Sequence, residues 1–488
     1  MFASSSPAET EGLARTLALY ARAGAVLLLE GDLGSGKSTF ARAFIRALAG
    51  GDESFDIPSP TFSLVQAYDN TRLPVAHVDL YRLAADAEAD ELGLEELARN
   101  HVLLIEWPRG AQSRISPDTL HLGFSGTGET RAIDLRPAGI WTRILERNAA
   151  LESFLRANGM DPATRRFFEG DASARRYEKV TVGGETRVLM DMPLRIDGPP
   201  VKDGKPYAVI AHSAEGLRDV LTVNGQLEAM GYGAPHIYQS DVANGFAVQE
   251  DLGARVYRDM IRAGEDMDAP MQAALEVLAD MHRRDWPRTI PPYDLDALLV
   301  EADLLPVWFH AHVHQTGAPQ ALHESFEAIW RDLLPETQLV NPVWTLRDYH
   351  SPNLLWLPDR EGLKRVGLID TQDALLGHPA YDLASLLQDA RTDIDFAWAD
   401  RLYDAYVSLR QAQGPFDEHA FARAFAILGA QRSSKILGIF ARLKARDGKP
   451  HYLQHMPRVS RYLTRSLQHP VLRPLKDWYE AHMPEALA

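Results

Sequence analysis

A glycine-rich stretch near the N-terminus constrains this chain more than any other feature of its sequence. The stretch has the form Gly31-x4-Gly36-Lys37-Ser38, and it follows the apolar run at residues 25–29. A short continuous apolar run is typical of a parallel strand buried on both faces. A strand, this glycine spacing and a following helix-like run make up a P-loop, in which backbone amides wrap phosphate groups.

The residue types of this loop predict a site for ATP and Mg²⁺. We expect the amides of Gly34, Ser35 and Gly36 to surround the phosphates. The amine of Lys37 would reach the β and γ oxygens, and the hydroxyl of Ser38 would bind Mg²⁺.

Two acidic residues on predicted strands extend this site. Glu106 ends the apolar run HVLLI, where a carboxylate can hold Mg²⁺ through water or orient the attacking water. Asp79, in the strand-like string HVDLY, is a second candidate ligand. An acid that ends a strand can also be a solvated edge residue, so this alternative stays open. The chain has no Asn-Lys-x-Asp string for guanine, which disfavours a GTPase.

Composition limits the class of protein. The chain has 488 residues, 45% of them hydrophobic, which predicts a globular protein of two or three domains. It has no cysteine, so disulfides and thiolate metal sites are excluded. Its net charge of −16 argues against a broad electrostatic grip on nucleic acid. No apolar run is long enough to span a bilayer, so we expect a cytoplasmic protein without direct membrane contact.

Five strings in the N-terminal part carry a family resemblance. In chain order they are GDLGSGKST at 31–39, SPTF at 59–62, HVDLYRL at 77–83, ELGLEE at 91–96 and LIEW at 104–107. Together they resemble TsaE, the bacterial ATPase family needed for threonylcarbamoylation of tRNA adenosine. The alternation of predicted strands and helices fits a small α/β domain, which we place at residues 1–147.

The resemblance to TsaE implies roles for residues and partners. Lys37 and Ser38 would bind ATP and Mg²⁺, and Thr39 would support the site. Asp79 and Glu106 would complete it. SPTF would be a nucleotide-sensing loop, although it also fits a proline-stiffened loop. The family acts through the TsaB and TsaD proteins, so contact with tRNA would be made only through partners.

A second group of polar residues lies near the middle of the remaining chain. Asp348 and Asn353 form an Asp-x4-Asn loop, and Asp370 closes the apolar run VGLID after a predicted hairpin. Kinase-like phosphoryl transfer needs such a trio, in which one carboxylate accepts the proton of the acceptor hydroxyl and Asn and Asp hold Mg²⁺ on ATP. The alternative is a loop without chemistry.

A glycine-containing string precedes a predicted strand earlier in the same part. The string GDAS starts at Gly170 and includes Asp171 and Ser173, which we predict to bind the phosphates of the nucleotide. Taken alone, GDAS indicates only a turn. Residues 165–248 are strand-rich and residues from 257 onward are helical, which predicts a small sheet lobe followed by a larger helical lobe.

Several strings of this second part resemble the aminoglycoside phosphotransferase-like kinases. They are GDASARRY at 170–177, VLMDMP at 188–193, QEDLG at 249–253, LRDYHSPNLL at 346–355 and IDTQDALLGHPAYDLASLL at 369–387. Within that family they resemble the anomeric kinases of N-acetylmuramate and N-acetylglucosamine. The resemblance implies that Asp348 is the catalytic base, that Asn353 and Asp370 bind Mg²⁺, and that the acceptor is a sugar C1 hydroxyl.

Some residues of this part depart from the kinase pattern. Leu346 replaces the usual histidine, and no Val-Ala-Ile-Lys string supplies a phosphate-pairing lysine. Arg175, Arg176 or Lys179 would have to substitute for that lysine. Asp373 and Asp382 also match the family pattern, and Asp382 fits a structural cap as well as a ligand.

The sequence therefore predicts a bifunctional enzyme. An α/β P-loop NTPase domain at 1–147 would precede a two-lobed α+β protein-kinase-like domain at 150–488, each with its own ATP and Mg²⁺. Alternatively, the second domain phosphorylates another small hydroxyl compound, such as an aminoglycoside or choline, or it binds a ligand without turnover and regulates the ATPase. Three nearby histidines, His310, His312 and His314, fit a polar helix face better than a metal site.

Overall fold

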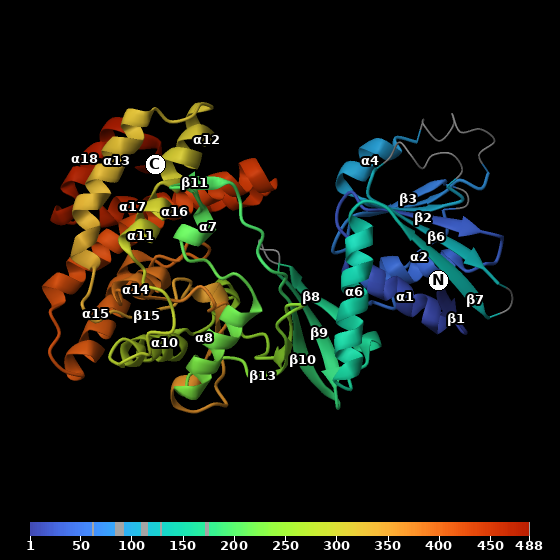
Figure 1. Cartoon of the computed structure of the whole chain (residues 1–488), viewed down its shortest axis with the longest axis horizontal. Helices are drawn as coiled ribbons and strands as arrows, with labels where there is room; N and C mark the ends of the chain where they lie inside the picture. The colour runs from blue at the N-terminus through green and yellow to red at the C-terminus, as the bar shows by residue number, and fades with distance from the viewer. Residues whose placement is uncertain (61–62, 83–91, 109–115, 127–128, 171–174, 488) are drawn as a thin grey trace. The chain divides into compact units, whose positions relative to one another are not determined.

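The structure is a computed structural model that describes residues 1–487 except 61–62, 83–91, 109–115, 127–128 and 171–174 (Figure 1). The chain divides into two compact units, Met1–Leu189 and Met190–Ala488. Among the described residues, no helix is long and apolar enough to cross a membrane.

A mixed sheet forms the centre of the first unit (Figure 1). Among the described residues it has seven strands, in the order β1-β7-β6-β2-β5-β4-β3. Their bounds are β1 Phe2–Ser4, β2 Val26–Gly31, β3 Val65–Tyr68, β4 Val75–Asp79, β5 Val102–Glu106, β6 Thr119–Ser125 and β7 Arg131–Pro137. The inner strands β6, β2, β5 and β4 are parallel, whereas β3, β7 and β1 run antiparallel to their neighbours. The strands predicted at residues 25–29 and in the strings HVDLY and HVLLI are confirmed as β2, β4 and β5, with shifted ends.

Helices cover both faces of this sheet because successive residues of a strand point to opposite sides. The helices are α1 Pro7–Leu19, α2 Lys37–Leu48, α4 Leu94–Asn100 and α6 Ile140–Ala157. Leu27 and Leu29 of β2 belong to the core that contains residues of α1, α2 and α6. Val26 and Leu28 belong to a second core with residues of α4. The continuous apolar run of β2 therefore serves both cores.

One helix spans the predicted domain boundary. Helix α6 is continuous from Ile140 to Ala157. The strands β8 Arg166–Gly170 and β9 Arg176–Val182, and β10 Glu185–Asp191 up to Leu189, also lie in the first compact unit. The two compact units divide between Leu189 and Met190. The domain boundary at 147–150 stays a prediction.

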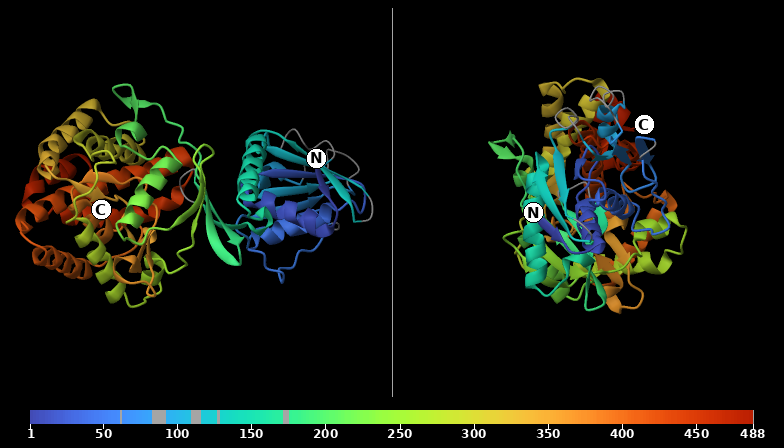
Figure 2. Two further views of the ribbon diagram at one scale, coloured as in Figure 1. Left: turned by 60° about the horizontal axis from the view of Figure 1, so that its bottom comes forward. Right: turned by 90° about the vertical axis from the view of Figure 1, so that its right-hand side faces the viewer.

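The second unit is mainly helical, as predicted for the chain beyond residue 257. Its helices include α8 Leu217–Ala229, α9 Tyr257–Arg262, α10 Asp268–Met281, α11 Leu295–Ala302, α13 Gln320–Leu333, α14 Ala380–Leu387, α15 Phe396–Ala412, α16 Glu418–Asp447, α17 Met456–Ser466 and α18 Arg473–His482. Figure 2 shows the many helices of this unit in green to red. Helix α16 contacts α11, α14 and α17, and many of its residues are buried. Helix α8 lies inside the region predicted as strand-rich. Its buried residues Leu217, Val220, Val223 and Leu227 repeat with a helical period.

Short strands of the second unit carry the predicted hairpin. β13 Ile237–Asp241 pairs with β14 Phe246–Glu250, and β15 Val343–Thr345 pairs with β18 Leu375–Gly377. β16 Leu354–Trp356 pairs antiparallel with β17 Val366–Leu368, which confirms the hairpin that the sequence predicted after Asn353.

Candidate active sites

The glycine-rich loop joins the end of β2 to the start of α2. Gly31, Gly34 and Gly36 have φ values of 147°, 75° and 104°, which side chains other than glycine rarely adopt. A Cβ atom on Gly31 would lie 2.4 Å from the carbonyl oxygen of Phe124, so only glycine fits there. Helix α2 starts at Lys37, and its free amides point toward the loop as they do in phosphate sites.

The side chain of Lys37 lies under this loop. Its Nζ donates to the carbonyl oxygens of Gly31 at 2.7 Å and Asp32 at 2.9 Å. It also lies 4.0 Å from the centre of the Trp107 ring. Burial lowers the pKa of Lys37, and the carboxylates of Glu106 and Asp79 oppose this shift. The amine is therefore held at the loop by acceptors that a phosphate can replace.

Asp79 and Glu106 lie side by side at the carboxyl edge of the sheet. They are the last residues of the neighbouring parallel strands β4 and β5, and they face each other in register. Both are buried. Ser38 Oγ donates to Glu106 Oε2 at 3.0 Å, so the predicted hydroxyl and carboxylate of the site are in contact.

A histidine that the sequence analysis did not single out holds the same carboxylate. Nε2 of His77 lies 3.0 Å from Oε1 of Glu106, and the side chain of His77 is 1% exposed. A carboxylate oxygen only accepts, so Nε2 carries the proton in this bond. His77 precedes Asp79 by two residues on β4, and this period-2 spacing was the available signal that both side chains share a face.

An arginine on β7, Arg131, donates hydrogen bonds to two carbonyl oxygens of the glycine-rich loop. Nε of Arg131 donates to the carbonyl oxygen of Ser35 at 2.7 Å, and its Nη2 donates to that of Gly34 at 3.2 Å. The hydroxyl of Ser35 is buried and has no hydrogen-bond partner among the described residues. An unpaired buried hydroxyl inside this glycine-rich loop fits a ligand with oxygen atoms. Thr39 lies in the first turn of α2.

The second site is built around a loop between β15 and β16. Nδ2 of Asn353 donates to the carbonyl oxygen of Asp348 at 3.1 Å, which closes this loop. Asn353 directly precedes β16, and Asp370 follows β17 by two residues. The amide of Ile369 donates to the carbonyl oxygen of Asn353 at 3.1 Å. The β16–β17 hairpin thus brings Asp348, Asn353 and Asp370 to one end, and their chemical roles stay predictions.

The charge state of Asp348 suits a base. Its side chain is 45% exposed. Partial burial favours its protonated form, but the charges of His350, Lys435 and Arg432 outweigh that effect and lower the pKa of Asp348 to about 2. Burial lowers the pKa of His350 to about 4. Asp348 is therefore ionised at neutral pH.

Asp382 holds the backbone of the same loop. Its side chain accepts the amides of Leu346 at 2.6 Å and Arg347 at 2.8 Å and is fully buried. Burial raises the pKa of Asp382 to about 7, against the effect of these two amides. Of the two roles that the sequence left open for Asp382, these bonds favour the structural cap. The side chain of Leu346 is buried, and its backbone amide makes one of them.

A buried ion pair lies behind the loop. Arg347 Nη2 contacts Glu301 Oε1, and Lys435 Nζ donates to the same oxygen at 2.7 Å. Arg347 Nη1 also donates to the carbonyl oxygen of Ala211 at 3.2 Å. Sequence patterns gave no signal for this cluster because its members are far apart in the chain.

A cavity of about 610 Å³ lies beside this site. Its lining includes Arg195, His212, Arg218, Asp294, Gln372 and Ala374. Nε2 of Gln372 donates to Asp370 Oδ1 at 3.2 Å and to Asp373 Oδ2 at 3.0 Å. Gln372 therefore connects the cavity to a predicted Mg²⁺ ligand. The sequence did not indicate this cavity.

Some predicted residues lie outside the part that the structure describes. These are Asp171 and Ser173 of GDAS, and the last two residues of SPTF. Gly170 is described as the last residue of β8, opposite Arg176 on β9. His312 is half-buried and His314 is exposed, whereas His310 is buried and its ring centre lies 4.4 Å from that of His314. Within the described residues, no group of three or more His, Asp and Glu side chains forms a metal site.

Comparison with known proteins gives a separate match for each part. The model of the threonylcarbamoyl adenosine biosynthesis protein TsaE matches residues 4–133. The model of the phosphotransferase enzyme family matches residues 164–425. Both matches confirm the predicted order of a P-loop α/β fold and a kinase-like fold.

Individual relatives repeat this division. An N-acetylmuramate/N-acetylglucosamine kinase of Caulobacter vibrioides is 36% identical over 358 residues, which cover 70% of this chain and 97% of that kinase. Its namesake in Pseudomonas aeruginosa is 33% identical over 60% of this chain and 80% of its own length. A tRNA threonylcarbamoyladenosine biosynthesis protein TsaE of Rickettsia felis is 36% identical over 125 residues, which cover 26% of this chain and 72% of that protein.

Proposed function

Because the chain belongs both to the TsaE family and to the phosphotransferase enzyme family, we propose that it carries two ATP-dependent activities. The N-terminal part is an ATPase that supports formation of threonylcarbamoyladenosine in tRNA. The C-terminal part transfers the γ-phosphoryl group of ATP to the anomeric hydroxyl of N-acetylmuramate or N-acetylglucosamine. The observation that carries the kinase proposal is the β16–β17 hairpin, which gathers Asp348, Asn353 and Asp370.

In the ATPase, the residues of the loop bind and orient the phosphates. The amides of Gly34, Ser35 and Gly36 surround them, and Lys37 leaves its carbonyl acceptors for the β and γ oxygens. Glu106 orients the attacking water, and His77 fixes the rotamer of Glu106.

In the kinase, Asp348 accepts the proton of the sugar hydroxyl as the phosphoryl group moves to the oxygen. A pKa of about 2 keeps this carboxylate ionised, so it is ready to orient the hydroxyl at neutral pH. Asp382 keeps the loop in place through two backbone amides. The cavity beside Gln372 is the site that we propose for the amino sugar.

Both sites have the oxygen ligands that Mg²⁺ prefers. Ser38, Asp79 and Glu106 would hold the ion in the ATPase, and Asn353 and Asp370 would hold it in the kinase. When bound, Mg²⁺ neutralises charge on the transferred phosphoryl group.

We propose that the ATPase acts through the TsaB and TsaD proteins, and that tRNA is reached only through them. The net charge of −16 supports this arrangement, because an acidic chain repels the phosphates of free tRNA. Since both reactions need ATP and one serves tRNA, we place the protein in the cytoplasm.

The test is a panel of acceptors with ATP and two variants. N-acetylmuramate, N-acetylglucosamine, an aminoglycoside and choline are incubated with the full chain, and phosphorylated products are identified by ³¹P NMR. We expect anomeric phosphate from the amino sugars. Asp348→Asn should lower the kinase kcat by at least about 100-fold, because the base is lost, and should leave the ATPase intact. Lys37→Ala should abolish ATP hydrolysis while sugar phosphate still forms.

Other outcomes separate the alternatives. Product from choline or the aminoglycoside alone would contradict the sugar specificity. ATP binding without any product would favour a ligand-binding module that regulates the ATPase.

A further inference from the structure

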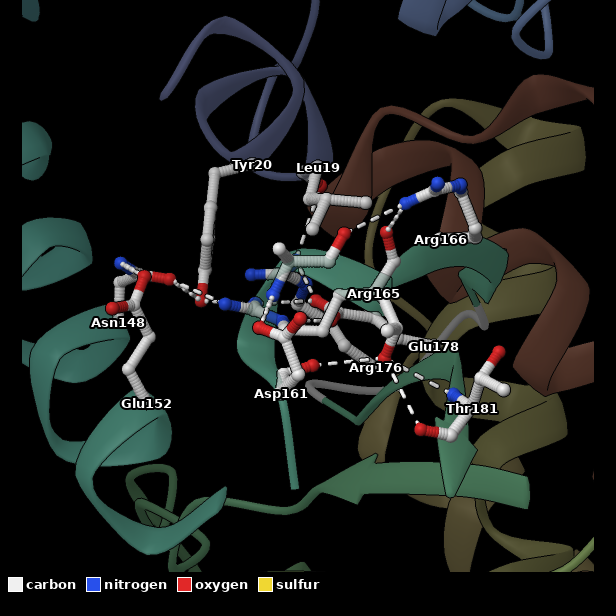
Figure 3. Close-up of polar contacts among 12 residues, drawn as sticks. Leu19, Tyr20, Asn148, Glu152, Asp161, Arg165, Arg166, Arg176, Glu178 and Thr181 are labelled. Atoms are coloured by element: carbon white, nitrogen blue, oxygen red, sulfur yellow. Dashed lines mark hydrogen bonds and ion pairs between the residues drawn. The ribbon is translucent and has the colours of Figure 1, made fainter. Parts of the chain in front are cut away.

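A buried arginine of the first unit joins segments that are far apart in sequence (Figure 3). Nε and Nη2 of Arg165 donate to the two carboxylate oxygens of Glu178, at 2.6 and 3.0 Å. Nη2 also donates to the hydroxyl of Tyr20 at 2.9 Å, and Nη1 donates to Oδ1 of Asn148 at 2.7 Å. The side chain of Arg165 is 1% exposed. Its ion pair is bidentate and the guanidinium is held from three sides, which makes the contact geometrically specific.

The end of α1 contributes further contacts to this cluster. Tyr20 directly follows α1, and its ring centre lies 3.9 Å from the guanidinium carbon of Arg176. Nη2 of Arg176 donates to the carbonyl oxygen of Leu19 at 3.1 Å and to Glu178 Oε1 at 3.1 Å. A cation at the carbonyl end of a helix is favourable. Arg176 thus joins the start of β9 to the end of α1.

A third arginine, Arg72, contacts the helix that starts at the P-loop. The amide of Arg72 donates to the carbonyl oxygen of Leu48, the last residue of α2, at 2.8 Å. Its Nη2 donates to the carbonyl oxygen of Ala18 at 2.7 Å, and its guanidinium lies 4.0 Å from the ring centre of Phe167. Burial, and then the charge of Arg176, lower the pKa of Arg72 to about 10. Arg72 therefore connects α2, α1 and β8.

Two of the contacting residues lie on the strands that precede and follow the candidate nucleotide loop of the kinase in the sequence. Phe167 lies on β8, and Glu178 lies on β9. Gly170 at the end of β8 is in register with Arg176 at the start of β9, and GDAS begins at Gly170. Both strands belong to the part that matches the phosphotransferase enzyme family. We call Tyr20, Arg72, Arg165, Arg176 and Glu178 the α1–hairpin interface.

We propose that the α1–hairpin interface is a docking surface through which the P-loop part holds the β8–β9 hairpin of the kinase, and that occupancy of the P-loop changes the affinity of the kinase for ATP. The inference rests on the proposed presence of two nucleotide sites. Helix α2 begins at Lys37 and ends at Leu48, so a shift of its start on phosphate binding reaches Arg72 and Phe167 through packed, hydrogen-bonded groups. Such coupling is reciprocal by linkage.

The experiment is a double-mutant cycle on the full chain, with the KM for ATP of the sugar kinase reaction as readout. Lys37→Ala empties the P-loop without touching the kinase residues, and we expect it to change this KM at least threefold. The double substitution Tyr20→Phe and Arg176→Gln removes the hydroxyl and the cation but leaves the Arg165–Glu178 pair. In that background the effect of Lys37→Ala should vanish. Arg15→Gln, on an exposed position of α1, is the matched control and should preserve the effect.

Two results would overturn the proposal while leaving the two activities in place: an unchanged KM in Lys37→Ala, or a change that persists in the interface variant. Absence of any sugar phosphate would instead contradict the proposed function. The coupling is then decided by hydrogen exchange of residues 166–182 at saturating ATP in the parent and in Lys37→Ala. Different protection of this segment supports the interface, and equal protection refutes it.

Discussion

At the scale of single residues, the ATPase site depends on how Glu106 is held. One of its carboxylate oxygens accepts a hydrogen bond from the hydroxyl of Ser38, and the other accepts one from Nε2–H of His77. A residue that orients a catalytic group through a hydrogen bond commonly contributes a factor of 10 to 100 to activity. We therefore expect His77→Ala to lower the ATPase kcat about 10-fold or more, and His77→Gln to retain more activity because it can still donate.

The measurement is steady-state ATP hydrolysis with a matched control. His121→Gln removes a histidine from β6, the strand next to β2, where His121 contacts the exposed side chain of Glu30, and should leave kcat unchanged. Equal kcat values for His77→Ala and the parent would refute the positioning role of His77.

At the scale of elements, α14 supports the kinase loop through Asp382 in its first turn. The pKa of Asp382 is about 7 in the folded protein and 3.8 for an ordinary Asp, so the folded state binds this proton more tightly. The protonated Asp382 side chain therefore contributes to the free energy of unfolding. This contribution is fully present below pH 3.8 and is lost as pH rises through about 7. The difference corresponds to at most about 4 kcal/mol.

Urea denaturation of the parent and of Asp382→Asn between pH 4 and 8 tests this linkage. The neutral amide cannot titrate, so the advantage of the parent over the variant should shrink as pH rises toward 7 and stay constant above it. A difference in unfolding free energy that is the same at every pH would contradict the raised pKa.

Local patterns predicted those elements whose evidence lies within a few consecutive residues. The P-loop, the strands β2, β4 and β5, and the β16–β17 hairpin belong to this class, because glycine spacing and apolar runs are local signals. The role of His77 was not predicted, because it depends on Glu106 of the neighbouring strand β5. The role of Arg131 was not predicted, because the loop that it contacts lies about a hundred residues earlier in the chain. The α1–hairpin interface depends on contacts such as that between Tyr20 and Arg165, which no local pattern records.

At the scale of the whole molecule, we propose that one chain binds two nucleotides. The P-loop of the first unit and the Asp348 loop of the second come from different families and use different residues. The α1–hairpin interface adds a physical connection between the P-loop part and the first strands of the kinase part. The two reactions are thus separate in chemistry and, by our proposal, linked in binding.

The most direct measurement of this claim is the stoichiometry of a non-hydrolysable ATP analogue at saturation, determined by calorimetric titration of the full chain with Mg²⁺. We expect two molecules bound per chain in the parent protein and one in Lys37→Ala. A single molecule bound to the parent under every condition would contradict it.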